Sequence, residues 1–174
     1  MDTQGTLAAL CASAGPSGRE QQTADLAMEL LRPLVDEVGQ DAFGNVVGVR
    51  RCGKAHARRV VLDAHLDEVG LVVTGAKHGF LRFRAVGGID PRVLPDQEFT
   101  LLTQPATVAV VAVLPPHVQK AGEGDNSLPL SQLYLDAGLT QAEAEGLVGT
   151  FAVPRSPLRP LLGHQRAAVK QHMV

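Results

Sequence analysis

The chain has 174 residues, of which 45% are hydrophobic and 20% charged, and its formal net charge is −2. This composition supports a packed core in one domain or two small ones, and the near-neutral charge argues against nucleic-acid or anionic-membrane partners. Aromatic residues make up only 3%, so Val, Leu and Ala must build most of the core. The two cysteines, Cys11 and Cys52, are isolated, which suits a reducing compartment.

The N-terminal residues lack the basic stretch and long apolar run of a secretory signal. The longest apolar run, residues 108–114, is too short to span a bilayer. We therefore expect a soluble, cytoplasmic protein without a membrane partner.

Helical patterns come first along the chain. Residues 3–14 predict a short helix that ends at Gly15-Pro16. Ser17 and Glu20 have the spacing of a capping box, so a second helix is expected to start at Ser17. Residues 35–42 and 46–50 then flank a turn sequence with Gly44, which predicts a β-hairpin.

The next segment joins an apolar run to a polar cluster. Residues 59–64 are rich in Val and Leu and predict a buried strand, which ends at His65, Asp67 and Glu68. Ligands of open α/β sheets bind where the strands end, and a neutral imidazole is a good zinc ligand. Asp67 leaves an extended chain on the same face as His65, where it could orient the ring. One His and one Asp are too few for a complete site, so a polar surface loop is the alternative.

From residue 69 onward, short strands alternate with turns that contain Gly or Pro. This spacing predicts a small β-barrel or sandwich. Asp90-Pro91-Arg92 is expected to form a turn held by hydrogen bonds and an ion pair. Thr140 and Glu143 are spaced as the capping box of a short helix. The expected strands are residues 69–74, 80–84, 98–103, 107–114, 133–135 and 148–153.

The other histidines are weaker candidates for metal binding. His56 is expected in a solvated loop and His78 in a hairpin turn, while His117 is expected to be structural. His164 and His172 lie in a polar tail, where exposure to solvent is the default expectation.

Five short sequence motifs follow one another along the chain, at residues 15–20, 41–46, 64–70, 87–95 and 115–117. Together they resemble the glutamyl or deblocking aminopeptidase family, dinuclear-metal peptidases that assemble as tetrahedral particles and whose relatives are also labelled endoglucanases. The resemblance covers nearly the whole chain. It implies that His65 is a metal ligand and that Asp67 is the catalytic-site carboxylate supporting it. The complete family site would hold two divalent metal ions, with zinc or cobalt expected.

The resemblance also implies an α/β fold. A partial aminopeptidase-type catalytic domain, phosphorylase/hydrolase-like, would be followed by an inserted small β-barrel-like domain. Residues 1–68 would begin the catalytic domain, residues 69–160 would be the insert used for dimer contacts, and residues 161–174 would re-enter the catalytic domain. Family members are much longer, and the Asp-Asp and Glu-Glu dipeptides that complete their metal site are absent from this sequence. We therefore expect a truncated chain with an incomplete site.

The implied function is that of a metallo-aminopeptidase, which hydrolyses N-terminal peptide bonds with a two-metal site, although this chain alone is expected to be inactive. The alternative is a non-catalytic assembly module that forms a homo-oligomer through residues 69–160. A weaker alternative is a glycosidase, which needs two carboxylates across a cleft.

Overall fold

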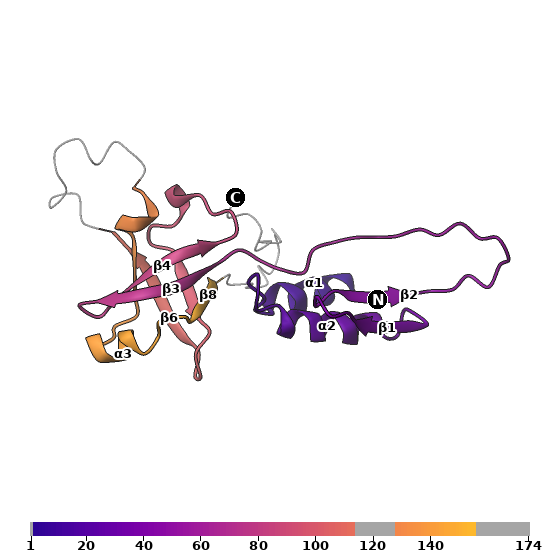
Figure 1. Ribbon diagram of the computed structural model, residues 1–174, viewed down its shortest axis with the longest axis horizontal. Helices are drawn as coiled ribbons and strands as arrows, with labels where there is room; N and C mark the ends of the chain where they lie inside the picture. The colour runs from indigo at the N-terminus through magenta and orange to yellow at the C-terminus, as the bar shows by residue number, and fades with distance from the viewer. Residues whose placement is uncertain (1, 114–127, 156–174) are drawn as a thin grey trace. The chain divides into compact units, whose positions relative to one another are not determined.

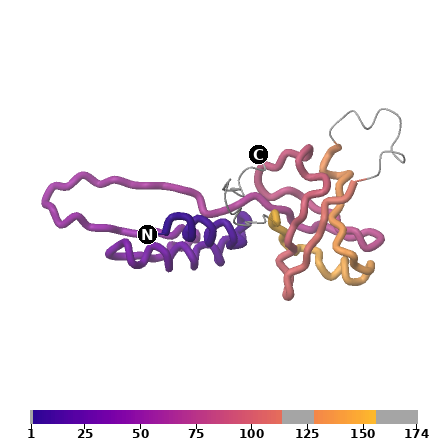
Figure 2. The backbone as a smooth tube through the Cα atoms, turned by 180° about the vertical axis from the view of Figure 1, so that it is seen from behind, coloured from indigo at the N-terminus to yellow at the C-terminus, as the bar shows by residue number. Residues whose placement is uncertain are grey.

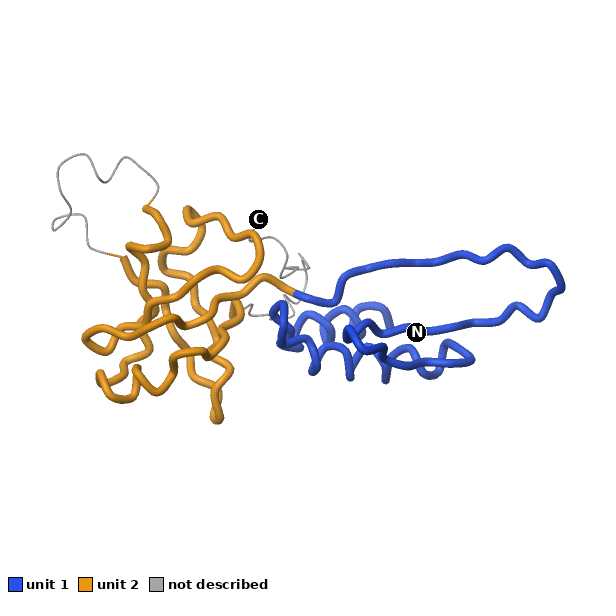
Figure 3. Tube along the Cα trace, viewed as in Figure 1, with its two compact units in different colours: residues 1–67 blue, residues 68–174 orange. Residues whose placement is uncertain are grey.

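The structure is a computed structural model that describes residues 2–113 and 128–155 (Figure 1). The chain divides into two compact units, Met1–Asp67 and Glu68–Val174 (Figure 3). His117, His164 and His172 lie outside the described residues, as does the expected re-entry at residues 161–174. No helix in the described ranges is long and apolar enough to cross a membrane.

Two helices open the first unit. Helix α1 spans Thr3–Ala12, and the Asp2 carboxylate caps it by accepting a hydrogen bond from the Gly5 N–H at 2.9 Å. Helix α2 spans Gln21–Leu31. Its buried residues are Thr23, Ala24 and Ala27.

The expected helix start at Ser17 is wrong. The chain instead makes a tight turn in which the Arg19 N–H donates to the Pro16 carbonyl at 2.8 Å and Gly18 takes a φ of 85°. The Glu20 carboxylate accepts from the Gly18 N–H at 2.6 Å, so it serves this turn and not a capping box. Helix α2 begins only after the turn and has no side-chain cap.

A β-hairpin completes the regular structure of the first unit, as expected. Strands β1 (Glu37–Gln40) and β2 (Val46–Val49) pair antiparallel. Gly44 in the connecting turn has a φ of 89°. The Asp41 carboxylate accepts from the Asn45 main-chain N–H at 2.9 Å and from the Asn45 side chain at 2.8 Å, which fixes the turn.

The expected strand at residues 59–64 is wrong. The chain between β2 and Asp67 contains no helix or strand and runs as a long open loop (Figure 2). Val60, Val61 and Leu62 are 81%, 86% and 94% exposed. A buried parallel strand needs neighbouring strands and covering helices, and the described part of this unit pairs no strand with the segment.

The second unit contains a closed antiparallel β-barrel, which confirms the barrel among the two expected all-β arrangements. Its strand order is β3-β4-β7-β6-β5-β8, so the first and last strands are hydrogen-bonded neighbours, with Leu71 opposite Ala152. The fold of the described chain is therefore mixed α/β. The strands are β3 (Gly70–Lys77), β4 (Phe80–Val86), β5 (Glu98–Leu101), β6 (Thr107–Ala112), β7 (Tyr134–Asp136) and β8 (Phe151–Pro154).

Buried and exposed side chains alternate along the strands, and the buried ones form the barrel core. In β4, Leu81 and Phe83 point inward and are buried, whereas Phe80, Arg82 and Arg84 are exposed. Each large apolar side chain that is fully buried contributes about 1.5–3 kcal/mol through the hydrophobic effect. The fully buried interior includes Leu71, Leu81, Phe99, Leu101, Val111 and Leu135.

Several connections in the barrel follow the expectations from the sequence. His78 and Gly79 link β3 to β4 with φ values of 55° and 85°, as a two-residue hairpin turn requires. Helix α3 (Gln141–Glu145) has the expected capping box between Thr140 and Glu143. Two short 3₁₀ helices, η1 (Pro91–Val93) and η3 (Leu130–Gln132), occupy loops.

The expected turn at Asp90-Pro91-Arg92 is also confirmed. The Arg92 N–H and Nε–H both donate to Asp90 Oδ1, at 2.9 and 3.0 Å, and Nη2 pairs with Oδ2. These contacts lower the pKa of Asp90 to about 2, chiefly through the side-chain hydrogen bonds from Arg92. The Asp90-Pro91-Arg92 turn thus shapes the loop before β5, and its internal contacts explain these residues without a ligand.

Candidate functional site

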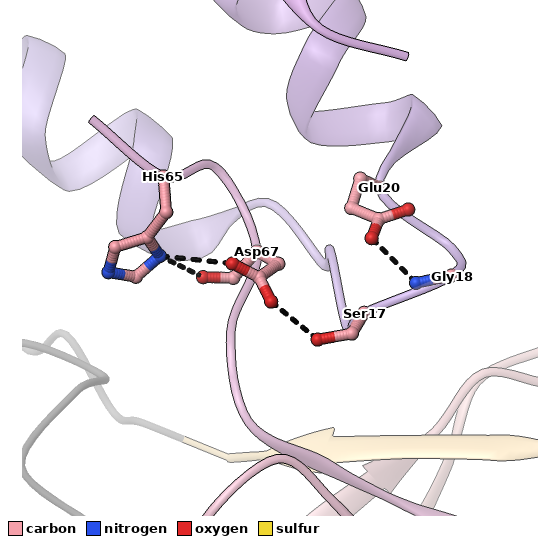
Figure 4. A network of polar contacts seen from close by, with 5 residues as sticks. All are labelled: Ser17, Gly18, Glu20, His65 and Asp67. Carbon is pink, nitrogen blue, oxygen red and sulfur yellow. Dashed lines mark hydrogen bonds and ion pairs between the residues drawn. The ribbon is translucent and has the colours of Figure 1, made fainter. Parts of the chain in front are cut away.

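His65 and Asp67 form the centre of the candidate site (Figure 4). His65 Nδ1 lies 2.9 Å from the Asp67 main-chain oxygen and 3.1 Å from Asp67 Oδ1. Both oxygens accept hydrogen bonds, so Nδ1 carries the hydrogen in the neutral ring. Nε2 then holds the lone pair, and Figure 4 shows it on the side of the ring that faces away from Asp67. The two residues therefore share the contact that their spacing suggested.

The second oxygen of Asp67 has a different partner. Ser17 Oγ donates a hydrogen bond to Asp67 Oδ2 at 2.5 Å (Figure 4). This hydrogen bond is the largest cause of a lowered pKa at Asp67, and the hydrogen bond and charge of His65 act in the same direction against the effect of burial. Asp67 is therefore a carboxylate at neutral pH, with one oxygen bound to Ser17 and the other to His65.

Ser17 was missed by reasoning from the sequence, which assigned it to a helix cap. It lies fifty positions from Asp67 along the chain, and no local spacing links the two residues. One signal could have pointed to a role for Ser17. Ser17 lies in residues 15–20, one of the short sequences that resemble the aminopeptidase family, and a helix cap alone would not account for that resemblance.

The His65–Asp67 pair has the chemistry of one metal ligand with its supporting carboxylate. The side chain of His65 is 61% exposed, so its ring is in contact with solvent. A ligating histidine commonly donates its other ring N–H to a carboxylate, which fixes the tautomer and the ring orientation. The donor set thus fits a single position in a zinc or cobalt site.

A complete metal site is not formed within residues 2–113 and 128–155, where no group of three or more His, Cys, Asp or Glu residues could hold an ion. A catalytic zinc normally has three protein ligands. His78 (φ 55°) lies in a hairpin turn and His56 (φ 59°) in an exposed loop, as expected. The described residues therefore do not supply a whole set of metal ligands.

Comparisons with known proteins identify the family of the chain. The sequence pattern of the M42 glutamyl aminopeptidase family matches residues 44–171. The lysyl aminopeptidase of Pyrococcus furiosus is 34% identical over 151 residues, which cover 80% of this chain and 43% of that protein. These matches include the segment that carries His65 and Asp67.

Solved structures give the same result. A TET aminopeptidase from a marine sediment archaeon of the Thaumarchaeota matches with a TM-score of 0.77 and 30% identity, over 87% of this chain and 43% of that one. The Pyrococcus horikoshii TET1 peptidase, described as able to assemble into a tetrahedron or a large octahedral shell, matches with a TM-score of 0.72 and 30% identity, over 90% and 48%. The chain spans less than half the length of these relatives. It belongs to the M42 glutamyl aminopeptidase family.

Proposed function

We propose that this chain carries part of the active site of a metallo-aminopeptidase, with His65 as a metal ligand and Asp67 as the carboxylate that orients it. The observation that carries the proposal is the contact between His65 Nδ1 and Asp67 Oδ1 at 3.1 Å. This contact leaves Nε2 as the ring atom suited to a metal ion. Membership of an aminopeptidase family supports the same assignment.

The proposed reaction is hydrolysis of an N-terminal peptide bond, with a peptide as the substrate. Two divalent ions, zinc or cobalt, would polarise the scissile carbonyl and activate a water molecule when bound. His65 would hold one ion through Nε2. Asp67 would keep the hydrogen on Nδ1 and prevent the ring from turning. Among the described residues, no group of three or more His, Cys, Asp or Glu supplies a complete ligand set for these ions.

The proposed domain organisation follows from the same family membership. Residues 1–68 would be the first part of a catalytic α/β domain, residues 69–160 an inserted barrel-like domain, and residues 161–174 the return to the catalytic domain. The barrel strands, which begin at Gly70 and end at Pro154, support the middle assignment. The exposed apolar segment at residues 59–64 supports the assignment of residues 1–68 to a catalytic domain, because its sequence suits a strand inside a larger sheet.

A graft tests the proposed function. This chain would replace the matching segment of the Pyrococcus furiosus lysyl aminopeptidase, and turnover of aminoacyl chromogenic substrates would be measured with and without added zinc or cobalt. We expect metal-dependent turnover. His65→Ala should reduce it by more than the roughly 100-fold reached when a supporting residue is lost.

The matched control is His56→Ala, because His56 is a histidine of the same segment placed in a solvent-exposed turn. Equal turnover in the two histidine variants would refute the metal-ligand role of His65. A folded graft without metal-dependent turnover would also count against the proposal.

A second proposed function, self-association through the barrel, rests on the barrel's outer face. Phe80 and Val110 are 40% and 38% exposed on this face. The Tyr134 ring packs edge-on against Phe80, with centroids 6.4 Å apart, and the Arg82 guanidinium lies 5.6 Å from the Tyr134 centroid. Aromatic residues and Arg are enriched in protein interfaces. We therefore propose a homo-oligomer whose contacts lie in residues 69–160, in keeping with the shells described for the Pyrococcus horikoshii relative.

A further inference from the structure

The turn that carries Ser17 is firmly attached to the first unit. Ser13 Oγ lies 2.9 Å from Thr23 Oγ1 in a buried hydrogen bond to helix α2. Gly15 passes so close to the same side chain that a Cβ on Gly15 would stand 2.4 Å from Thr23 Oγ1. The Arg19 N–H then closes the turn onto the Pro16 carbonyl at 2.8 Å. Ser17 is therefore presented by a well-fixed backbone.

Asp67, in contrast, lies at the end of a segment without helix or strand. The side chain of Asp67 is 41% exposed, so water competes for its oxygens. The terminal torsion of an Asp side chain has only broad preferences, so the plane of the carboxylate is set by its partners. One partner is the ring of His65, whose side chain is 61% exposed. The other partner is Ser17 Oγ at 2.5 Å.

From this geometry we propose that Ser17 is a positioning residue, whose hydroxyl fixes the Asp67 carboxylate so that Asp67 in turn holds the His65 ring with Nδ1 inward and Nε2 outward. Ser17 acts through Asp67, to which its hydroxyl donates. Figure 4 shows the order of contacts, from the Ser17 hydroxyl to one carboxylate oxygen and from the other oxygen to the imidazole. This order also excludes a nucleophilic role in which a histidine would activate the serine, because the carboxylate stands between them.

The inference rests on the proposed metal-ligand role of His65, but its first test needs no metal. Nitrogen-15 NMR of the full chain at about pH 8, well above the ordinary histidine pKa, reports which ring nitrogen of His65 carries the hydrogen. We expect the Nδ1–H tautomer in the unaltered chain and in Ser17→Thr, which keeps the hydroxyl. In Ser17→Ala we expect a larger share of the Nε2–H tautomer, limited by the Asp67 main-chain oxygen, which still accepts from Nδ1 at 2.9 Å.

The matched control is Thr6→Ala, which removes an exposed hydroxyl from helix α1, where it donates to the Asp2 main-chain oxygen and contacts neither Asp67 nor the Ser17 turn. It should leave the His65 tautomer unchanged. An unchanged tautomer in a folded Ser17→Ala variant would overturn the proposal. If Ser17→Ala does not fold, Ser17→Cys keeps the shape and weakens the donor, and an unchanged tautomer in that variant would overturn the proposal equally.

Zinc titration, followed by the same His65 signals, separates this inference from the proposed function. We expect the apparent Kd for zinc to rise about 10-fold in Ser17→Ala, the lower end of the range for supporting residues. If zinc does not affect His65 in any variant while the tautomer depends on Ser17, the positioning role stands and the metal-ligand role fails. If zinc binds His65 equally well with and without the Ser17 hydroxyl, the positioning role fails and the proposed function stands.

Discussion

Gly79 lies so close to Leu139 that a Cβ built on Gly79 would stand 2.3 Å from the Leu139 carbonyl oxygen. Gly79 also has a φ of 85°, where residues other than glycine are strained. We expect Gly79→Ala to destabilise the barrel by more than about 1 kcal/mol, because the obstacle is rigid backbone. Urea unfolding would measure the loss. Gly88→Ala is the control, since a Cβ there meets nothing within 4 Å, and equal midpoints for the two variants would contradict the expectation.

Leu135 occupies the middle of the barrel interior, opposite Leu81 on one neighbouring strand and Val111 on the other. We expect Leu135→Ala to cost about 2–5 kcal/mol, because the closed barrel cannot collapse into the cavity. Thermal or urea unfolding gives the free energy. Val110→Ala, on the outer face of β6, should change stability by less than about 0.5 kcal/mol. A comparable loss from the outer-face variant would mean that the inside and outside of β6 are assigned wrongly.

The Asp90–Arg92 pair predicts a specific acid response. The pKa of Asp90 falls from 3.8 to about 2 because Arg92 donates to its carboxylate. A lowered pKa in the folded state means that the contact stabilises the fold above pH 3.8, and that this contribution is lost as the pH falls through about 2. We expect carbon-13 NMR to give an Asp90 midpoint near 2, and Arg92→Gln to move it back toward 3.8. Arg84→Gln, on the outer face of β4, should leave it unchanged, and an unmoved midpoint in Arg92→Gln would contradict the expectation.

The 174-residue chain alone should lack measurable aminopeptidase turnover. Its described residues offer one imidazole supported by one carboxylate, whereas a catalytic zinc needs three protein ligands. The assay uses aminoacyl chromogenic substrates with excess zinc, cobalt or manganese. Turnover that disappears in His65→Ala would show that further ligands are present and would defeat this expectation.

Self-association should be sensitive to the outer face of the barrel. We expect the double substitution Val108→Lys and Val110→Lys to reduce the oligomer seen by light scattering, because two charges would be buried at the contact. The alternative route is the exposed segment at residues 59–64, where apolar side chains could recruit other copies. Val61→Lys with Leu62→Lys tests that route in the same full chain. If only the second pair of substitutions lowers the molecular mass, the barrel is not the interface.

Relationships between residues close in sequence were sufficient to predict the strands and turns of the barrel. The alternation around Leu81 and Phe83, the His78-Gly79 turn and the Thr140 capping box each depend on residues only a few positions apart. The strand bounds differ from expectation by only a few residues for the same reason, since strand ends follow the turns. What the sequence could not provide was the order of strands around the barrel, which depends on contacts between distant residues.

The failures lie in the first unit, where structure depends on partners distant in sequence. The run at residues 59–64 has the composition of a buried strand, but composition does not create the neighbouring strands that bury it. The spacing of Ser17 and Glu20 usually marks a helix start, but here the Glu20 carboxylate accepts from the Gly18 N–H in a turn. The Ser17 hydroxyl donates to Asp67 instead of capping a helix. The contact between His65 and Asp67 could be expected from the sequence, because a spacing of two residues is a local relationship.

The pairing of β3 with β8 has a consequence for how such a barrel is carried in a longer chain. Leu71 stands opposite Ala152 on antiparallel neighbours, so the polypeptide enters and leaves the barrel at adjacent points. A host protein can therefore receive the whole barrel between two consecutive residues without its own ends being pulled apart. The same geometry makes the barrel removable, since a short glycine-rich bridge spans the gap between neighbouring strands. Gain or loss of this module by recombination would then leave the surrounding fold in register.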